Sequence, residues 1–175
     1  MTIKTIFLDR DGVINKEINY LYRIEDFEFI DGVFSACKHF INLGYKIIIV
    51  TNQSGISRGY YTLNDFNKIT LWMLDQFKSQ EIDILDVFYC PHSPDDNCNC
   101  RKPKPGMFIE AKKKHSINMK ESWMIGDSQR DITAASLTGI TKTILLNSGD
   151  KTNEENAQPK YYLNSVKDTI NVVKF

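Results

Sequence analysis

Short apolar runs alternate with longer amphipathic stretches along the whole of this 175-residue chain. Five of the apolar runs are bounded by turn residues and predict buried strands at residues 3–8, 47–50, 85–89, 123–125 and 143–146. Apolar residues at helical spacing predict helices at residues 33–43, 63–79, 106–115, 130–138 and 165–173. This alternation predicts an α/β fold: a doubly wound, Rossmann-like and mainly parallel sheet in a single domain over residues 1–175.

The segments without periodicity indicate where a pocket forms. Residues 15–31 and 90–105 are the longest irregular stretches that separate predicted elements. We expect them to form the pocket walls, and no segment between strands is long enough to be a separate cap domain. Residues 148–159 are polar and predict an exposed loop before the last segment.

Charge and composition exclude several classes of partner. The 22 basic and 22 acidic residues cancel, which argues against general binding of nucleic acid. No apolar run approaches the ~18 residues that a membrane-spanning helix needs, and the first residues do not resemble a signal peptide. We therefore expect a cytoplasmic monomer that acts on a small molecule and has no nucleic-acid or membrane partner.

The first predicted strand ends in two aspartates, Asp9 and Asp11, followed by Gly12. Ligands usually bind at the carboxyl ends of parallel strands, and two carboxylates this close raise each other's pKa unless a cation lies between them. Magnesium suits such oxygen ligands. One carboxylate can then attack phosphorus while the other transfers the proton. The alternative is an ordinary strand end in which Asp-Gly forms a turn.

Three further segments offer groups for phosphoryl transfer. Thr51 follows the second predicted strand, and its hydroxyl and the nearby amides can bind phosphate oxygens without adding negative charge. Asp127 follows the fourth strand as a candidate metal ligand, with Asp131 as a neighbouring acid that could orient it. Lys102 lies in a basic segment that two prolines stiffen, and a lysine can neutralise both a carboxylate nucleophile and a phosphate. The segment after Thr51 is also compatible with an ordinary loop that enters a helix.

Three cysteines and a histidine are bunched within eleven residues: Cys90, His92, Cys98 and Cys100. This set matches a tetrahedral Cys₃His zinc site with no position left for water, and so a structural site. Its expected role is to fix the loop that presents Lys102. The alternatives are a thiol redox pair at Cys98 and Cys100, or unconnected surface thiols.

The four strand-end segments, in this order, resemble the haloacid dehalogenase superfamily over nearly the whole chain. The resemblance implies the fold of that superfamily, with Asp9 as the nucleophile and Asp11 as general acid and base. It further implies that Thr51 and Lys102 stabilise the phosphate. Magnesium would be held by Asp9, the backbone carbonyl of Asp11, and Asp127.

Residues 6–15, 20–32, 51–59 and 90–107 also resemble the D-glycero-D-manno-heptose-1,7-bisphosphate 7-phosphatase family, a neighbour of the histidinol-phosphate phosphatases. Both groups are capless and carry the zinc loop. Two features depart from this pattern: the interval 93–97 is short, and Ser128 replaces a basic residue found in some members. The resemblance implies a sugar pocket lined by Glu17, Asn19, Tyr20, Asn52, Gln53, Ser54 and Arg101.

The function implied is a magnesium-dependent phosphatase that forms an aspartyl-phosphate intermediate and removes the 7-phosphate of the heptose bisphosphate. Its product would feed synthesis of ADP-heptose and the lipopolysaccharide core. Histidinol-phosphate hydrolysis is the alternative, because the catalytic residues act only on the phosphoryl group. A receiver-like, phosphate-sensing switch is an alternative of another class, but such a switch has no use for an acid and base like Asp11 beside its nucleophile.

Overall fold

Six parallel strands form the central sheet of the computed structural model, which describes residues 1–146 and 158–174. Their order across the sheet is β3-β2-β1-β4-β5-β6. The strands are β1 (Thr5–Leu8), β2 (Lys46–Asn52), β3 (Ile84–Cys90), β4 (Trp123–Gly126), β5 (Lys142–Leu146) and β6 (Tyr161–Leu163). All five predicted strands are therefore confirmed.

The sequence did not predict β6, and two other expectations about the last part of the chain need comment. β6 is a three-residue edge strand that is only partly buried, so it has no apolar run to reveal it. The helix expected at 165–173 is instead a short 3₁₀ helix, η4 (Val166–Asn171). Residues 165–173 include five β-branched residues, which disfavour a continuous α-helix. The loop expected at 148–159 lies outside the described residues except for its last two positions.

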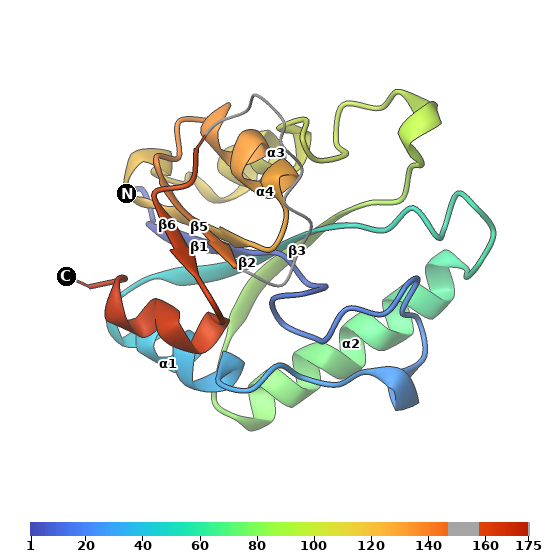
Figure 1. Cartoon of the computed structure of the whole chain (residues 1–175), viewed down its shortest axis with the longest axis horizontal. Helices are drawn as coiled ribbons and strands as arrows, with labels where there is room; N and C mark the ends of the chain where they lie inside the picture. Colours follow the sequence, from blue (N-terminus) through green and yellow to red (C-terminus); the bar gives the residue numbers. More distant parts are fainter. Residues whose placement is uncertain (147–157, 175) are drawn as a thin grey trace.

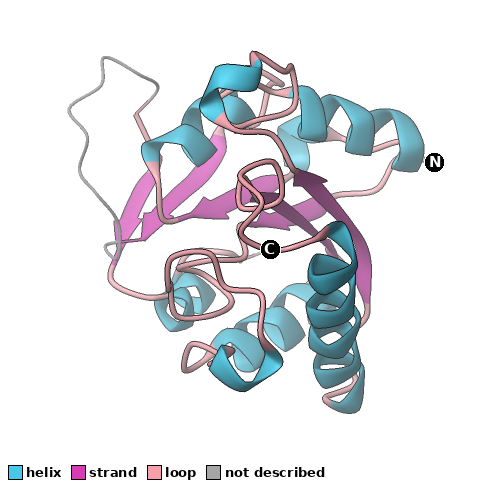
Figure 2. Ribbon diagram, turned by 90° about the vertical axis from the view of Figure 1, so that its right-hand side faces the viewer, coloured by secondary structure: helices cyan, strands magenta, loops and turns pink. Residues whose placement is uncertain are grey.

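Four α-helices cover the sheet on both faces (Figures 1 and 2). α1 (Val33–Asn42) and α2 (Leu63–Ser79) lie on one face, whereas α3 (Gly106–His115) and α4 (Gln129–Ser136) lie on the other. Successive side chains of a strand point to opposite faces, so each strand contributes to two separate cores. Ile6, Leu8, Ile47 and Ile49 pack with α1 and α2, and Phe7, Ile48 and Val50 pack with α3 and α4.

The register of the strands brings the carboxyl ends of β1, β2 and β4 together. Leu8 pairs with Ile49 of β2 and with Ile125 of β4. The backbone N–H of Asp9 continues the ladder by donating to the carbonyl of Ile125 (3.1 Å). The residues that follow these three strands therefore emerge side by side at one edge of the sheet.

Loops that follow β1, β2 and β3 gather at this same edge, on the right in Figure 1. They contain only short 3₁₀ turns, η1 (Ile24–Asp26) and η2 (Pro94–Asp96); a third turn, η3 (Met119–Glu121), precedes β4. Among residues 1–146 and 158–174, no cap domain covers this edge. In the described part of the chain, no helix is both long enough and apolar enough to cross a bilayer.

Candidate active site

Three aspartates meet at the carboxyl edge of the sheet and form what we call the carboxylate cluster: Asp9 after β1, Asp127 after β4, and Asp131 in the first turn of α4. One oxygen from each lies within 4.8 Å of the others. Asp127 and Asp131 are buried, and the Asp9 side chain is only 13% exposed. Gly12 permits this approach: it has φ +81°, and a Cβ there would lie 1.9 Å from Oδ2 of Asp127.

Lys102 reaches the carboxylate cluster from the loop after β3. Its buried ammonium group lies 3.0 Å from Oδ1 of Asp9 and 2.6 Å from Oδ1 of Asp131, and it donates to the carbonyl of Val50 at 2.8 Å. These contacts use all three ammonium protons. Burial alone would lower the pKa of Lys102, but Asp131 and Asp9 outweigh it and raise the pKa above its usual range.

One lysine does not balance the negative charge of the carboxylate cluster. Burial and then the charge of Asp131 raise the pKa of Asp9 well above its ordinary value, against the opposing effect of Lys102. Burial, Asp131 and Glu17 raise the pKa of Asp127 to about 7. Buried carboxylates with such pKa values are suited to a hard divalent cation, for which carboxylate oxygens are the preferred ligands.

The three carboxylates are not equally available to a cation. Asp131 accepts from Lys102 through Oδ1 and from the backbone N–H of Ser128 through Oδ2 (3.1 Å), which closes the capping box of α4. Oδ1 of Asp9 accepts from Lys102 and from the N–H of Arg10 (2.8 Å), and no donor in the described residues reaches Oδ2. Asp9 and Asp127 are therefore the residues that could hold a metal ion.

Asp11 lies outside the carboxylate cluster, and hydrogen bonds from neighbouring side chains hold its carboxylate group. The buried guanidinium of Arg10 contacts both of its oxygens at 3.0–3.2 Å, and the amide of Asn15 donates to Oδ1 at 3.0 Å. Gln53 donates to Oδ2 at 3.1 Å, while its own carbonyl oxygen accepts from Tyr61. Four side chains thus fix the orientation of Asp11, directly or through Gln53.

This network contains residues that the sequence reasoning missed, namely Arg10, Asn15 and Tyr61. The position of Arg10 between the two aspartates indicated that it could pair with one of them. The direction of its side chain, however, depends on the path of the loop that follows β1. Thr51, predicted to stabilise phosphate, is fully buried, and its hydroxyl accepts from Gln53 at 2.8 Å. The residue of β2 that lines the cavity is its neighbour, Asn52.

Two adjoining cavities open at this edge. The carboxylate cavity, of about 170 Å³, is lined by Asp11, Glu17, Asn52, Lys102, Ser128, Arg130 and the carboxylate cluster. The loop cavity, of about 250 Å³, shares Asp11, Glu17, Asn52 and Arg130 with it. All seven predicted sugar-pocket residues line the loop cavity: Glu17, Asn19, Tyr20, Asn52, Gln53, Ser54 and Arg101.

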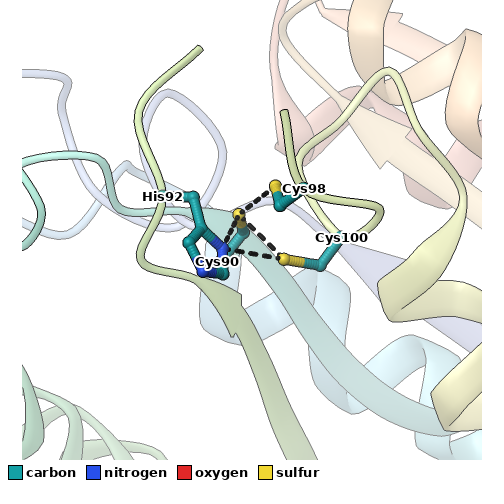
Figure 3. Close-up of side chains that lie close together, drawn as sticks. All are labelled: Cys90, His92, Cys98 and Cys100. Atoms are coloured by element: carbon teal, nitrogen blue, oxygen red, sulfur yellow. Dashed lines mark hydrogen bonds between the residues drawn. The ribbon is translucent and has the colours of Figure 1, made fainter. Parts of the chain in front are cut away.

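The cysteine cluster comprises Cys90 at the end of β3 with His92, Cys98 and Cys100 from the following loop, and the four side chains point toward one another (Figure 3). Sγ of Cys90 lies 3.0 Å from Cys100, 3.6 Å from Cys98 and 3.5 Å from Nδ1 of His92. These distances exclude a disulfide. Tetrahedral zinc with ~2.3 Å bonds to sulfur would separate two sulfurs by roughly 3.8 Å. The distance from Cys90 to Cys98 is close to this value and that to Cys100 is shorter, and the four side chains together offer the donor types that zinc prefers. Hydrogen bonds from the Arg101 N–H and from the other thiols outweigh burial and lower the pKa of Cys98 to about 7, which favours a thiolate ligand.

Backbone hydrogen bonds connect the cysteine cluster to Lys102. The N–H of Arg101 donates to Sγ of Cys98 at 3.4 Å. The side-chain amide of Asn52 holds the backbone of Lys102: it accepts from the Lys102 N–H at 3.0 Å and donates to the Lys102 carbonyl at 3.1 Å. Gly106 lets α3 begin against this loop, since a Cβ there would lie 2.3 Å from the carbonyl oxygen of Asn99. The cysteine cluster is thus in a position to hold the backbone that presents Lys102.

Comparison with known proteins gives consistent matches. The family described as HAD-hydrolase-like matches residues 99–169. A D-glycero-alpha-D-manno-heptose-1,7-bisphosphate 7-phosphatase from Photorhabdus laumondii is 48% identical over 164 residues, covering 89% of this chain and 90% of the relative. The beta-anomer counterpart from Helicobacter pylori is 44% identical, covering 83% and 84%. A crystal structure of D,D-heptose 1,7-bisphosphate phosphatase from B. bronchiseptica, complexed with magnesium and phosphate, superposes with a TM-score of 0.89 at 27% identity and covers 98% of both chains.

Proposed function

Because the chain belongs to the D-glycero-D-manno-heptose-1,7-bisphosphate 7-phosphatase family of the HAD-like hydrolases, we propose that it removes the 7-phosphate of that heptose bisphosphate. The chain is accordingly a phosphatase. Heptose 1-phosphate would be the product, on the route to ADP-heptose and the lipopolysaccharide core. The observation that carries the proposal is the junction of two cavities, one holding the carboxylate cluster and one lined by polar loop residues and two arginines.

Asp9 acts as the nucleophile in this proposal. Lys102 and the N–H of Arg10 hold its Oδ1 in place, and a carboxylate oxygen of Asp9 attacks phosphorus. The phosphorus–oxygen bond to the sugar breaks, and Asp11 donates a proton to the departing oxygen. Asp11 then takes a proton from the water that cleaves the aspartyl phosphate, which regenerates Asp9.

The carboxylate cluster fits Mg²⁺, and Asp9 and Asp127 would hold it together with the backbone carbonyl of Asp11 that the family resemblance implies. When bound, Mg²⁺ supplies positive charge that offsets the carboxylates and the substrate phosphate. Lys102 contributes a second positive charge, which its contacts to Asp9 and Asp131 hold beside the nucleophile. For Thr51 we retain the proposal that it stabilises phosphate, although its hydroxyl is buried and accepts from Gln53.

For the cysteine cluster we propose a structural Zn²⁺. Three sulfurs and one imidazole nitrogen complete a tetrahedron, so no open position is left for catalysis. We also propose that the enzyme acts as a monomer, which size-exclusion chromatography with light scattering would test.

The distinguishing experiment is a panel of phosphate esters assayed with Mg²⁺, containing heptose 1,7-bisphosphate, histidinol phosphate and p-nitrophenyl phosphate. We expect the bisphosphate to have the highest kcat/KM. Phosphorus NMR should show loss of the 7-phosphate signal while the anomeric phosphate remains. Loss of the anomeric signal, or faster hydrolysis of histidinol phosphate, would overturn the assignment. A single burst of phosphate without turnover would favour the receiver-like switch.

A further inference from the structure

Arg130 occupies a position that the mechanism above does not use. It lies in the first turn of α4, and it lines the carboxylate cavity and the loop cavity at once. It also lines a third cavity of about 270 Å³, which the loop of the cysteine cluster borders through Pro94 and Cys98. The Arg130 side chain therefore stands where the three cavities meet.

A short hydrogen-bonded turn sets the direction of this side chain. The hydroxyl of Ser128 caps α4 by accepting from the backbone N–H of Arg130 at 3.3 Å. The same hydroxyl oxygen accepts from Nε of Arg130, also at 3.3 Å. The guanidinium is thus folded back over the start of the helix, toward the cavities, although the residue itself is exposed.

Arg101 lines two of the same three cavities and carries the same charge. Nη1 of Arg101 donates to the carbonyl of His92 at 3.4 Å. Both arginines line the loop cavity and the third cavity, so their two positive charges lie on the same walls. In residues 1–146 and 158–174, no carboxylate forms an ion pair with either arginine. Two guanidinium groups on the walls of the same two cavities favour a multiply charged anion, because guanidinium binds phosphate oxygens through paired hydrogen bonds.

We propose that Arg130 is a specificity-determining residue that binds the phosphate which stays on the substrate, together with Arg101. This inference rests on the proposed function and extends it to a residue outside the predicted pocket. Lys102 lies beside the nucleophile Asp9, whereas Arg130 lines both the carboxylate cavity and the loop cavity, so Arg130 is placed for the other end of a bisphosphate.

The test compares two substrates that differ only in the distal phosphate, heptose 1,7-bisphosphate and heptose 7-phosphate. Arg130→Gln should lower kcat/KM for the bisphosphate about 10- to 100-fold, chiefly through KM, as expected for loss of charge-assisted hydrogen bonds. The decrease in kcat/KM for the monophosphate should be several-fold smaller. The ratio of kcat/KM for the bisphosphate to that for the monophosphate should therefore decrease. Arg130→Lys should restore part of the ratio, because it keeps the charge but loses the paired geometry.

Lys113→Gln serves as the matched control, because it removes one exposed positive charge from α3 and should leave the ratio unchanged. Ser128→Ala should lower the ratio by a smaller factor than Arg130→Gln, because it only releases the side chain. Equal losses of kcat/KM on both substrates in Arg130→Gln, or no loss, would overturn the proposal.

If the wild type hydrolyses neither heptose ester, the proposed function fails. In that case the role of Arg130 is tested with fructose 1,6-bisphosphate and fructose 6-phosphate, by comparing the ratio of their kcat/KM values in the wild type and in Arg130→Gln.

Discussion

The carboxylate cluster and the cysteine cluster are held in different ways, although Lys102 connects them. The carboxylates emerge from β1, β4 and the first turn of α4, positions that the register of the sheet fixes. The cysteine cluster has only Cys90 on a strand, and its other three members lie on the loop that follows. The first cluster is buried and negatively charged, whereas the second brings three thiols and an imidazole together and is partly exposed. Strand ends and a helix N-terminus hold the carboxylates, and the cysteine loop is in a position to hold the backbone that presents Lys102.

The largest expected effect is at the nucleophile. Asp9→Asn removes the attacking oxygen and should lower kcat to below ~10⁻⁴ of the wild-type value, since loss of a covalent nucleophile typically costs this much or more. Steady-state release of phosphate with Mg²⁺ measures it, with bound metal counted in parallel. Asp26→Asn is the matched control, because it makes the same substitution at an exposed aspartate outside the carboxylate cluster and should leave turnover unchanged. Near-normal turnover in Asp9→Asn would refute the covalent mechanism.

Asp11→Asn should slow both steps by ~10²–10⁴, the usual range for general acid–base catalysis. The amide keeps the size of the side chain but accepts and donates no catalytic proton. A substrate with a good leaving group needs little protonation, so p-nitrophenyl phosphate should lose less in the first step than a sugar phosphate does. An equal loss in the first step for both esters, measured by rapid quench, would argue against Asp11 as the acid.

Disruption of the cysteine cluster should have a smaller effect on activity, about 10- to 100-fold, because it acts through the position of Lys102. We expect metal analysis to find ~1 zinc per chain in the wild type, and Cys98→Ser should release it and lower the melting temperature. Cys37→Ala is the matched control: burial raises the pKa of this core thiol to about 12, so it is inert, and its loss should leave zinc in place. Full activity restored by zinc alone after complete stripping would contradict the division between the two sites.

Both clusters could be anticipated from the sequence because strand ends in a parallel sheet share an edge and because cysteine spacing is local. What the sequence could not show depends on side-chain direction. A strand end placed Thr51 at the site, yet the alternation of the pleat buries its side chain, and Asn52 lines the cavity. Likewise Arg10 and Arg130 carry no periodic signal, and their roles follow from hydrogen bonds to Asp11 and Ser128 that only the folded chain defines.

The smallest expected effect is a dependence of protein stability on pH that comes from the carboxylate cluster. In the metal-free protein, Asp127 has a pKa of about 7, raised from 3.8. Between about pH 4 and pH 7 the folded chain therefore holds a proton that the unfolded chain has released. Through the ionisation of Asp127, the stability of the metal-free protein should consequently fall as the pH rises through this range.

Mg²⁺ competes with that proton, so its stabilising effect should run in the opposite direction. At pH 8 and ~100 times its Kd, Mg²⁺ should add ~2.7 kcal/mol to the free energy of unfolding, or roughly 5–10 °C in melting temperature. At pH 6 and the same concentration, a tenfold weaker affinity leaves ~1.4 kcal/mol. Differential scanning fluorimetry at the two pH values measures this, and Asp127→Asn should abolish the difference. An Mg²⁺ shift of equal size at pH 6 and pH 8 would show that the buried carboxylates are not the groups that bind the ion.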